Sequence, residues 1–435
     1  MIPHEDTIVA IATAAGGGVG IIRLSGSDAL SITKAHFRGL PERAQARYAY
    51  HGWWLNQDGE ALDEGLVLLM PGPHSFTGED VAELHLHGGA LNLRHAMEVC
   101  VQAGARPAEP GEFSRRAFLN GRIDLTRAEA ISDVIAAQTD QALGAARAQL
   151  KGALAERCLS FRREIIDLRA RLEVTIDFVE EDVPVIDPQE LKSEADAISR
   201  ELLELAGTFS QGRLWQEGAR VVLTGPPNAG KSSLFNALCG QERAIVTPSP
   251  GTTRDTLEAT IDVLGVPLIL IDTAGMRETE DPIEAEGVER AHKALVDADL
   301  VLHLLEEGQH PDENASGLFV ASKADIRAEV PRGSIAVSAM NGQGLEALQE
   351  AIVERLGGRA EGGGRLVITR ARHHAALIRA AQCLRAAAEA LESNQPAELV
   401  AVDVAEASDA LGDIVGITTI EDVLDRLFGS FCIGK

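Results

Sequence analysis

The sequence lacks the usual marks of a secreted, membrane-spanning or zinc-stabilised protein. Its five cysteines are scattered and form no Cys-x-x-Cys pair: Cys100, Cys158, Cys239, Cys383 and Cys432. This odd, dispersed set argues against a disulfide framework and a structural zinc site, and indicates reduced thiols. No apolar run approaches the about 18 residues of a membrane span, and the acidic N-terminus has no signal-peptide pattern. We therefore expect a cytoplasmic protein with no membrane partner.

Positive charge is scarce as well. The chain has 40 Lys and Arg against 66 Asp and Glu, a formal net charge of −26. Such a chain does not hold nucleic acid through a broad basic surface, because binding to phosphates needs clustered Lys and Arg. If RNA is a partner, its binding must be local or shared with another subunit. The length of 435 residues favours roughly three domains.

The pattern of apolar residues predicts an α/β multidomain protein. Residues 1–120 predict an α+β domain with a mostly antiparallel sheet, because strand candidates follow one another without regular helix alternation. Residues 121–215 form long Ala-, Leu-, Arg- and Glu-rich helices, and Thr126-x-x-Glu129 predicts a capping box at the first of them. Residues 216–360 alternate strands with helices, and helices resume over 361–435. We interpret this order as one helical domain with an α/β domain inserted at a surface loop.

The most informative stretch of the sequence runs from Val221 to Ser233. An apolar strand pattern enters a glycine-bracketed loop, a helical pattern leaves it, and Gly225-x4-Gly230-Lys231-Ser232 matches the P-loop. The glycines let backbone N–H groups point at phosphate oxygens, and the helix N-terminus adds its positive end. Lys231 supplies a point charge for the β- and γ-phosphates, and the Ser232 hydroxyl is a hard ligand for Mg²⁺.

Further motifs follow in the order of the small GTPases. They are Gly251–Asp255, Asp272-Thr273-Ala274-Gly275, Ser322-Lys323-Ala324-Asp325 and Ser338-Ala339. Asp272 is placed to reach Mg²⁺ through water, and the Gly275 amide to contact the γ-phosphate. Asp325 is placed to accept hydrogen bonds from guanine nitrogens, which adenine does not offer. The motifs therefore predict GTP rather than ATP as the nucleotide.

Two positions depart from the usual pattern. Ser322 stands where the fourth motif normally begins with Asn, and we expect the shorter side chain to lose contacts between the base loop and the P-loop. Met276 stands where Ras-type enzymes have a water-orienting Gln, so the catalytic group must come from elsewhere. The following acidic segment, 277–290, offers several carboxylates, although an acidic surface helix explains them equally well.

With these motifs the chain resembles the MnmE (TrmE) family of tRNA modification GTPases, among the TrmE-Era-EngA-like GTPases. The resemblance covers essentially the whole chain and includes Ser75–Asp80, Glu83–Gly89, Pro110–Asn120, Gly225–Ser233, Gly251–Asp255 and Phe431–Lys435. It implies an N-terminal folate-binding and dimerising domain, and a helical domain interrupted by a Ras-like P-loop GTPase domain. It also implies a homodimer whose GTPase domains meet across the nucleotides.

The resemblance assigns roles within the GTPase domain. The catalytic, water-orienting Glu falls on Glu284, and the switch threonine on Mg²⁺ falls on Thr253, beside Ser232. A potassium ion is implied at Asn228, Thr247, Ser249 and Thr252, where its charge would replace an arginine finger. Taken alone, Asn228 is equally well explained as a turn residue. The full set of implied GTP contacts is Asn228, Ala229, Gly230, Lys231, Ser232, Ser233, Thr247, Pro248, Ser249, Pro250, Gly251, Thr252, Thr253, Asp272, Thr273, Ala274, Gly275, Ser322, Lys323, Asp325, Ser338 and Ala339.

In the N-terminal domain the resemblance implies a tetrahydrofolate site, for the 5,10-methylene or the 5-formyl form. Its contacts fall on Arg23, Glu83, Arg122 and the C-terminal Lys435, although Arg122 stands where a Lys is often seen. Each of these, taken alone, is more often a surface ion-pair residue. Cys432 is then either a reactive thiol beside the folate or an inert cysteine.

Four histidines also raise the question of a metal. His85 and His87 share one face of a predicted strand, but no His or Cys cluster follows at zinc spacing. A structural or folate-adjacent role is the better interpretation for them. For His373 and His374 we expect a helix surface.

The function that the resemblance implies is a potassium-stimulated GTPase of tRNA wobble uridine modification. It would act with the flavoprotein MnmG, in a heterotetramer or larger complex, and add an aminomethyl or carboxymethylaminomethyl group at uridine C5. Two alternatives stay open. An Era-type ribosome-assembly GTPase would carry a basic RNA-binding module, which the sequence does not display. A folate-dependent aminomethyl transferase would use its GTPase domain only for regulation.

Overall fold

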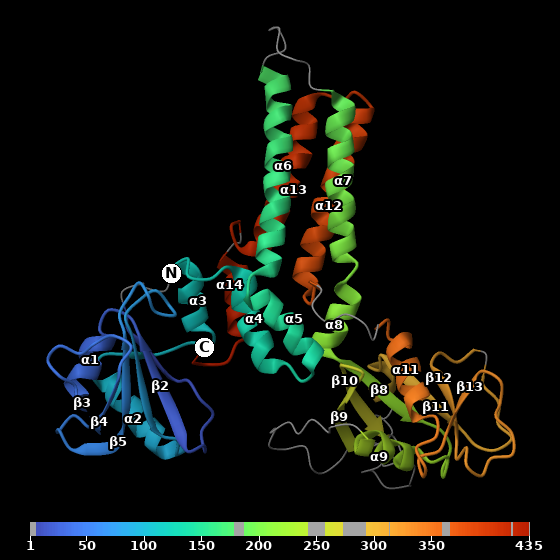
Figure 1. The fold of residues 1–435 in the computed structure, drawn as a ribbon, viewed down its shortest axis with the longest axis horizontal. Coiled ribbons are helices and arrows are strands. Elements are labelled where there is room, and N and C mark those ends of the chain that lie inside the picture. The colour runs from blue at the N-terminus through green and yellow to red at the C-terminus, as the bar shows by residue number, and fades with distance from the viewer. Residues whose placement is uncertain are drawn as a thin grey trace. The chain divides into compact units, whose positions relative to one another are not determined.

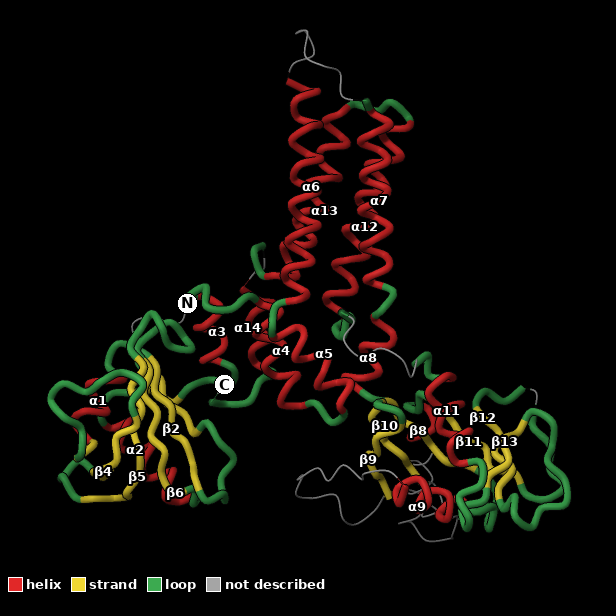
Figure 2. Tube along the Cα trace, viewed as in Figure 1, coloured by secondary structure: helices red, strands yellow, loops and turns green. Residues whose placement is uncertain are grey.

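The computed structural model describes residues 6–177, 187–241, 257–272, 293–312, 314–358, 366–418 and 421–434. Two compact units make up the chain: Met1–Ser132 with Val415–Lys435, and Asp133–Ile414. Figures 1 and 2 show the helices and strands of each unit. The domain boundaries predicted at 120/121, 215/216 and 360/361 stay predictions.

The first unit is built on the predicted antiparallel sheet. Its strands, in the order β3-β4-β5-β6-β2-β1-β7, pair antiparallel except for the short parallel pair β1–β7. The strands are β1 (Ile8–Ile11), β2 (Val19–Ser25), β3 (Phe37–Arg38), β4 (Ala49–Leu55), β5 (Ala61–Met70), β6 (Val81–His87) and β7 (Arg106–Pro107). Apolar residues at alternate positions, such as Ile22 and Leu24 of β2, are fully buried, as the period of two of a strand places them on one face.

Two helices, α1 (Ala29–His36) and α2 (Ala90–Gln102), pack on this sheet. The other helices of the unit are α3 (Glu112–Leu119), α4 (Leu125–Ala136), which runs on into the second unit, and α14 (Glu421–Gly429). Leu93 and Ala96 of α2 join the sheet's core. The C-terminal segment packs on α3, where the rings of Phe118 and Phe428 lie 6.5 Å apart. The C-terminal tail therefore lies beside the sheet domain.

A buried ion network fixes the segment before β6. Arg116 of α3, 3% exposed, pairs with Asp6 at 2.6 Å, Glu112 at 3.0 Å and Glu79 at 3.2 Å. Burial by itself would raise the pKa of Glu112, but the hydrogen bonds and charges of Arg106 and Arg116 outweigh it and lower the pKa. The network thus anchors Glu79, and with it the loop 75–79, to α3.

The capping box predicted at Thr126 is wrong. Helix α4 begins at Leu125, and the Asp124 carboxylate accepts hydrogen bonds from the Arg127 N–H at 3.1 Å and from the Thr126 hydroxyl. Asp is as good an N-cap as Thr, and here it lies two residues earlier. Thr126 is fully buried inside the first turn.

The second unit contains a bundle of long helices. Its helices are α5 (Asp140–Leu150), α6 (Ala153–Asp177), α7 (Pro188–Ala206), α8 (Phe209–Glu217), α12 (Ala371–Glu392) and α13 (Ala397–Val415). Figure 1 shows α6, α7, α12 and α13 running alongside one another. Apolar residues spaced by three and four, such as Leu191, Ala195, Ile198 and Leu202, form the buried stripe of α7. The Ser199 hydroxyl donates to the Ala381 carbonyl of α12 at 2.9 Å.

An α/β fold occupies the chain between α8 and α12. Its sheet has the order β13-β12-β11-β8-β10-β9, parallel throughout except for the hairpin β9–β10. The strands are β8 (Ala219–Thr224), β9 (Leu257–Val263), β10 (Val266–Asp272), β11 (Leu300–Leu305), β12 (Leu318–Ser322) and β13 (Ser334–Val337), and the helices are α9 (Lys231–Gln241) and α11 (Leu345–Arg355). The central strands β8 and β10 are apolar and buried along most of their length, as is typical of parallel sheets that are covered on both faces.

The two ends of this α/β fold meet at one buried carboxylate. Asp133 of α4, 3% exposed, accepts hydrogen bonds from Gln216 at the end of α8 (3.0 Å) and from Arg370 just before α12. The chain therefore leaves the helices and returns to them at nearly the same place. This is the insertion that the sequence predicts, since an inserted domain needs neighbouring termini.

Within the described ranges, no helix combines the length and the apolar character that crossing a membrane requires. No disulfide links the five cysteines, all of which lie in the described part of the chain. Burial raises the pKa of the Cys100 thiol to about 12, so that this residue acts as a small core hydrophobe.

Candidate functional site

The loop between β8 and α9 has the backbone of a phosphate cradle. Gly225 and Gly230 have φ of +149° and +90°, and Asn228 between them has φ of +64°. A Cβ atom on Gly225 would lie 2.6 Å from the Leu304 carbonyl oxygen, so only glycine fits there. Asn is one of the few other residues that adopt a left-handed conformation readily. The Asn228 side chain is exposed.

Lys231 opens α9 and lies inside this loop. It is 9% exposed, and its Nζ donates to the carbonyl oxygens of Gly225 at 2.6 Å and Pro226 at 2.8 Å. These contacts hold the ammonium group at the centre of the loop, where a phosphate oxygen would accept from it. The loop therefore combines a positive end of a helix, inward-facing backbone and a buried cation.

Two hard oxygen ligands lie next to this cation. The Ser232 hydroxyl donates to Oδ2 of Asp272 at 2.9 Å, and Asp272, 1% exposed, is the last residue of β10. Strands β8 and β10 are parallel neighbours, so their carboxyl ends bring the P-loop and Asp272 together. A hydroxyl and a carboxylate are the donors that Mg²⁺ prefers, and this pair fits such an ion.

Ser322 connects the next motif to the P-loop. It ends β12, is 9% exposed, and its hydroxyl donates to the Ala229 carbonyl at 2.6 Å. We expected this serine to lose the contact between the base loop and the P-loop. That expectation is wrong, because β12 approaches the P-loop closely enough for a short side chain to make the bond.

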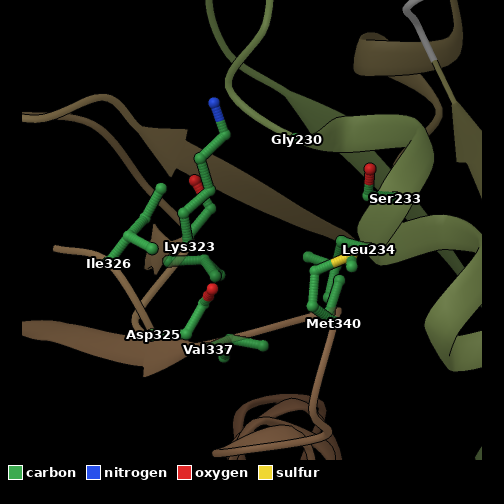
Figure 3. Close-up of a pocket in the computed structure, with 11 residues that line it drawn as sticks. Gly230, Ser233, Leu234, Lys323, Asp325, Ile326, Val337 and Met340 are labelled. Carbon is green, nitrogen blue, oxygen red and sulfur yellow. The ribbon is translucent and has the colours of Figure 1, made fainter.

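A cavity of about 270 Å³ lies between α9 and the loops after β12 and β13. Figure 3 shows the Asp325 carboxylate directed into the space between Lys323 and the Leu234–Met340 pair. The lining residues are Gly230, Ser233, Leu234, Val320, Ser322, Lys323, Asp325, Ile326, Val337, Ala339 and Met340. The cavity is thus apolar around one carboxylate, which suits a flat base that presents N–H donors at one edge.

The sequence motifs account for most of this lining but not for all of it. Ile326 and Met340 are 76% and 88% exposed, which is unusual for large apolar side chains, and neither was predicted as a site residue. Each directly follows a predicted motif, after Asp325 and Ala339. That adjacency is the signal that could have identified them. Ser338, which was predicted, is fully buried, and its N–H donates to the Gln343 carbonyl rather than into the cavity.

A large part of the predicted GTPase machinery lies outside the described residues. This part comprises Thr247, Pro248, Ser249, Pro250, Gly251, Thr252, Thr253, Thr273, Ala274, Gly275 and Glu284. The predicted potassium ligands other than Asn228, the second predicted Mg²⁺ ligand and the predicted catalytic glutamate all belong to it.

In the first unit, the sheet brings Arg23 and Glu83 together. They are paired across β2 and β6, and Arg23 Nε donates to Glu83 Oε1 at 2.8 Å. Arg23 Nη1 also donates to the carbonyl of Gly434 in the C-terminal tail at 3.3 Å. The guanidinium lies 5.9 Å from the Phe76 ring centroid and 5.7 Å from that of Phe113. An arginine, a carboxylate and two aromatic rings from distant parts of the chain therefore form one cluster.

The other residues predicted for this region are placed around the cluster. Arg122 Nε donates to the Ser75 carbonyl at 3.1 Å, next to Phe76. Lys435 lies outside the described residues. The Cys432 side chain is exposed, and its carbonyl accepts from the Gly111 N–H at 3.3 Å. The tail thus reaches the cluster through Gly434, with Cys432 two residues away.

The histidines pair with carboxylates. His85 Nε2 lies 3.4 Å from Oε2 of Glu83, and His87 Nδ1 lies 2.7 Å from Asp63, which raises the pKa of His87. No group of three metal-binding side chains occurs in the described part of the chain. The helix-surface prediction is wrong for His373, which is fully buried in α12, whereas His374 stacks on Phe209.

Comparisons with family models and with sequence relatives agree with these features. A family model described as MnmE helical domain matches residues 125–432, and one described as GTP-binding protein TrmE N-terminus matches residues 7–122. The tRNA modification GTPase MnmE of Symbiobacterium thermophilum is 44% identical over 457 residues, which cover 99% of this chain and 100% of the relative. The protein of the same name from Chloroflexus aurantiacus is 46% identical over 454 residues, with the same coverage. The solved structure of an Aquifex aeolicus Era variant bound to GDP and AlF4⁻ aligns with a TM-score of 0.26 and 22% identity, over 38% of this chain and 66% of that one.

Proposed function

This chain belongs to the MnmE family of tRNA modification GTPases, and on that premise we propose that it hydrolyses GTP to drive modification of the wobble uridine of tRNA. The proposal rests on one observation. The same edge of the sheet carries Lys231, Asp272 and the cavity beside Asp325. One end of that edge suits phosphates and the other suits a purine base. Gly230 lies between the two ends, because it lines the cavity and directly precedes Lys231 in the P-loop.

The mechanism follows from what each side chain offers. The P-loop N–H groups and Lys231 bind the β- and γ-phosphates and stabilise the charge that grows on them in the transition state. Ser232 and Asp272 would hold Mg²⁺, and the ion would neutralise charge on the phosphate oxygens. Met276 has no group that could orient the attacking water, and the family resemblance assigns this role to Glu284.

We propose that a potassium ion also binds at this site. The amide oxygen of Asn228 is a suitable ligand. Asn228 is a P-loop residue with a left-handed backbone, and its side chain is exposed. Thr247, Ser249 and Thr252 would supply further oxygens. The ion's charge would serve as an arginine finger does in other GTPases.

The N-terminal cluster supports a tetrahydrofolate site. Arg23 and Glu83 offer a donor fork and an acceptor beside the rings of Phe76 and Phe113, which fits a flat heterocycle with both donor and acceptor edges. Arg122 and Lys435 supply cations for the folate's carboxylates. The folate, when bound, supplies the one-carbon unit, in the 5,10-methylene or the 5-formyl form.

The proposed assembly is a homodimer that works with the flavoprotein MnmG in the cytoplasm. The net charge of −26 supports a division of labour in which MnmG carries most of the tRNA-binding surface. An RNA-binding assay of this chain alone tests that division. Weak binding is expected, and tight binding that falls steeply with added salt would contradict it.

Replacement of Na⁺ by K⁺ is expected to raise the rate of GTP hydrolysis by about tenfold or more, since a bound cation is to stand in for an arginine finger. Asn228→Ala should abolish this stimulation, so that the variant hydrolyses GTP at the same rate in K⁺ and in Na⁺. The measurement is phosphate release at saturating GTP in matched chloride salts.

Asn394→Ala is the matched control for this experiment. Asn394 is also exposed and also has a left-handed backbone, with φ of +50°, but it lies in the turn between α12 and α13. The control should keep the full stimulation. Equal rates of the wild-type protein in K⁺ and Na⁺ would exclude the potassium part of the proposal.

A further inference from the structure

Arg327 lies just beyond the base-recognition motif and makes an unusual set of contacts. Its Nη1 donates to the carbonyl oxygens of Leu305 at 2.8 Å and Ser322 at 3.3 Å. Its Nη2 donates to the Glu306 carbonyl at 2.7 Å, and its Nε to the Glu329 carbonyl at 3.0 Å. All four acceptors are backbone groups, so the planar fork of the guanidinium acts here as a clamp between chain segments.

The clamp encloses the segment that carries Asp325. Leu305 and Glu306 mark the end of β11, Ser322 ends β12, and Glu329 lies later in the loop after β12. The loop curls back on itself, because the N–H groups of Ile326 and Arg327 both donate to the Lys323 carbonyl at 3.1 Å. Asp325 thus lies on a loop whose start and end are both held by one side chain.

Packing alone does not hold this loop. A second cavity, of about 300 Å³, is lined by Ala229, Leu305, Glu306, Glu307, Ser322, Lys323, Ile326 and Arg327. Three residues therefore line both cavities, the one beside Asp325 and the one beside Arg327. They are Ser322, Lys323 and Ile326. Without the guanidinium, the loop has room to move away from the base.

The position of the Asp325 side chain depends on the loop that carries it. Its side chain is exposed, and no hydrogen bond or ion pair of this carboxylate occurs in the part of the chain that the structure describes. Its orientation must therefore come from the backbone of the loop. Two further bonds hold the N-terminal side of this loop: the Ser322 hydroxyl donates to the Ala229 carbonyl of the P-loop, and the Ala324 N–H donates to the Val337 carbonyl of β13 at 3.1 Å.

We propose that Arg327 is a positioning residue for guanine recognition, because it holds the loop that presents Asp325 to the base. The inference rests on the proposed binding of GTP, and it deepens that proposal by adding a residue outside all the nucleotide motifs. Ligand affinity falls in proportion to the fraction of molecules whose site is correctly formed. Loss of the clamp lowers that fraction, whereas the phosphate contacts at Lys231 do not involve Arg327.

The test is a double-mutant cycle between Arg327→Met and Asp325→Ala, measured by equilibrium binding of a fluorescent GDP to the full-length chain. Arg327→Met is expected to raise the Kd for GDP by about ten- to thirtyfold in the wild-type background and by less than about threefold in the Asp325→Ala background. At saturating GTP, its kcat should equal that of the wild type. Arg327→Lys, which keeps the charge but not the planar fork, should give an intermediate Kd.

Arg332→Met is the matched control, because Arg332 is an exposed arginine in the same loop region, before β13. It should leave the Kd unchanged. The same loss of affinity in both Asp325 backgrounds, or no loss in either, would overturn the inference, and Arg327→Lys decides the outcome if the Met variant does not fold. Failure of the wild-type chain to bind GDP would instead contradict the proposed function itself.

Discussion

Asp325→Asn is expected to change the preferred nucleotide from GTP to XTP. Guanine presents two N–H donors at one edge, and a carboxylate accepts both. An amide offers one acceptor and one donor, which match the N–H and the C2 carbonyl of xanthine. A site that is built to hydrogen-bond its ligand discriminates by a factor of about 10⁴ against an analogue that leaves a buried group unpaired. We expect at least about a 10³-fold loss of GTP affinity, since Asp325 is partly open to solvent.

The measurement is the Kd for GDP and for XDP, together with the rate of GTP and XTP hydrolysis. Asp167→Asn, on the exposed surface of α6, is a suitable control for the loss of one negative charge. If the Asp325→Asn variant binds GDP as tightly as the wild type, the cavity around Asp325 is not the base site.

Lys231→Ala is expected to lower kcat/KM for GTP by about 10³-fold or more. Lys231 is the buried cation of the P-loop, and its ammonium group donates to the Gly225 and Pro226 carbonyls. We expect these donors to turn toward phosphate oxygens when the nucleotide binds. Removal of one charge-assisted donor to a transition state typically costs 10²- to 10³-fold, and here the ground-state phosphates lose the same contact. Both KM and kcat should therefore be affected.

Steady-state hydrolysis and GDP binding of this variant check the prediction. Lys34→Ala, an exposed lysine of α1, removes the same charge from the first unit and should be silent. Unchanged hydrolysis by Lys231→Ala would show that the phosphates bind elsewhere.

The sequence could predict the phosphate site because the P-loop depends on local features. Its glycines, Lys231 and Ser232 are contiguous, and a strand pattern before them with a helix pattern after them fixes the local geometry. The neighbouring strands were predicted from apolar runs, and parallel pairing then brings Asp272 to the same edge. Motif order was sufficient here.

Tertiary contacts decided the features that the sequence did not reveal. The hydrogen bond from Ser322 to Ala229 depends on how close two segments approach, 93 residues apart in the chain. Arg327 contacts backbone carbonyls, which any sequence could supply, so no residue pattern marks its partners. The misplaced helix start at Thr126 has a local reason, because Asp124 and Thr126 both suit an N-cap and only the structure shows which one is used.

The N-terminal cluster depends even more on distant pairing. Arg23 and Glu83 meet through the register of β2 and β6, 60 residues apart, and Gly434 joins them from the other end of the chain. Neither periodicity nor spacing indicates these partners. Family resemblance named the residues, and the fold supplies the physical reason why they lie together.

Nucleoside mass spectrometry of bulk tRNA, from cells with and without this chain, tests the account most directly. We expect the aminomethyl-type modifications at C5 of wobble uridine to disappear without the chain. They should return with the wild-type gene but not with Lys231→Ala. Persistence of these nucleosides in cells without the chain would contradict the assignment to tRNA modification and favour a general RNA-assembly GTPase.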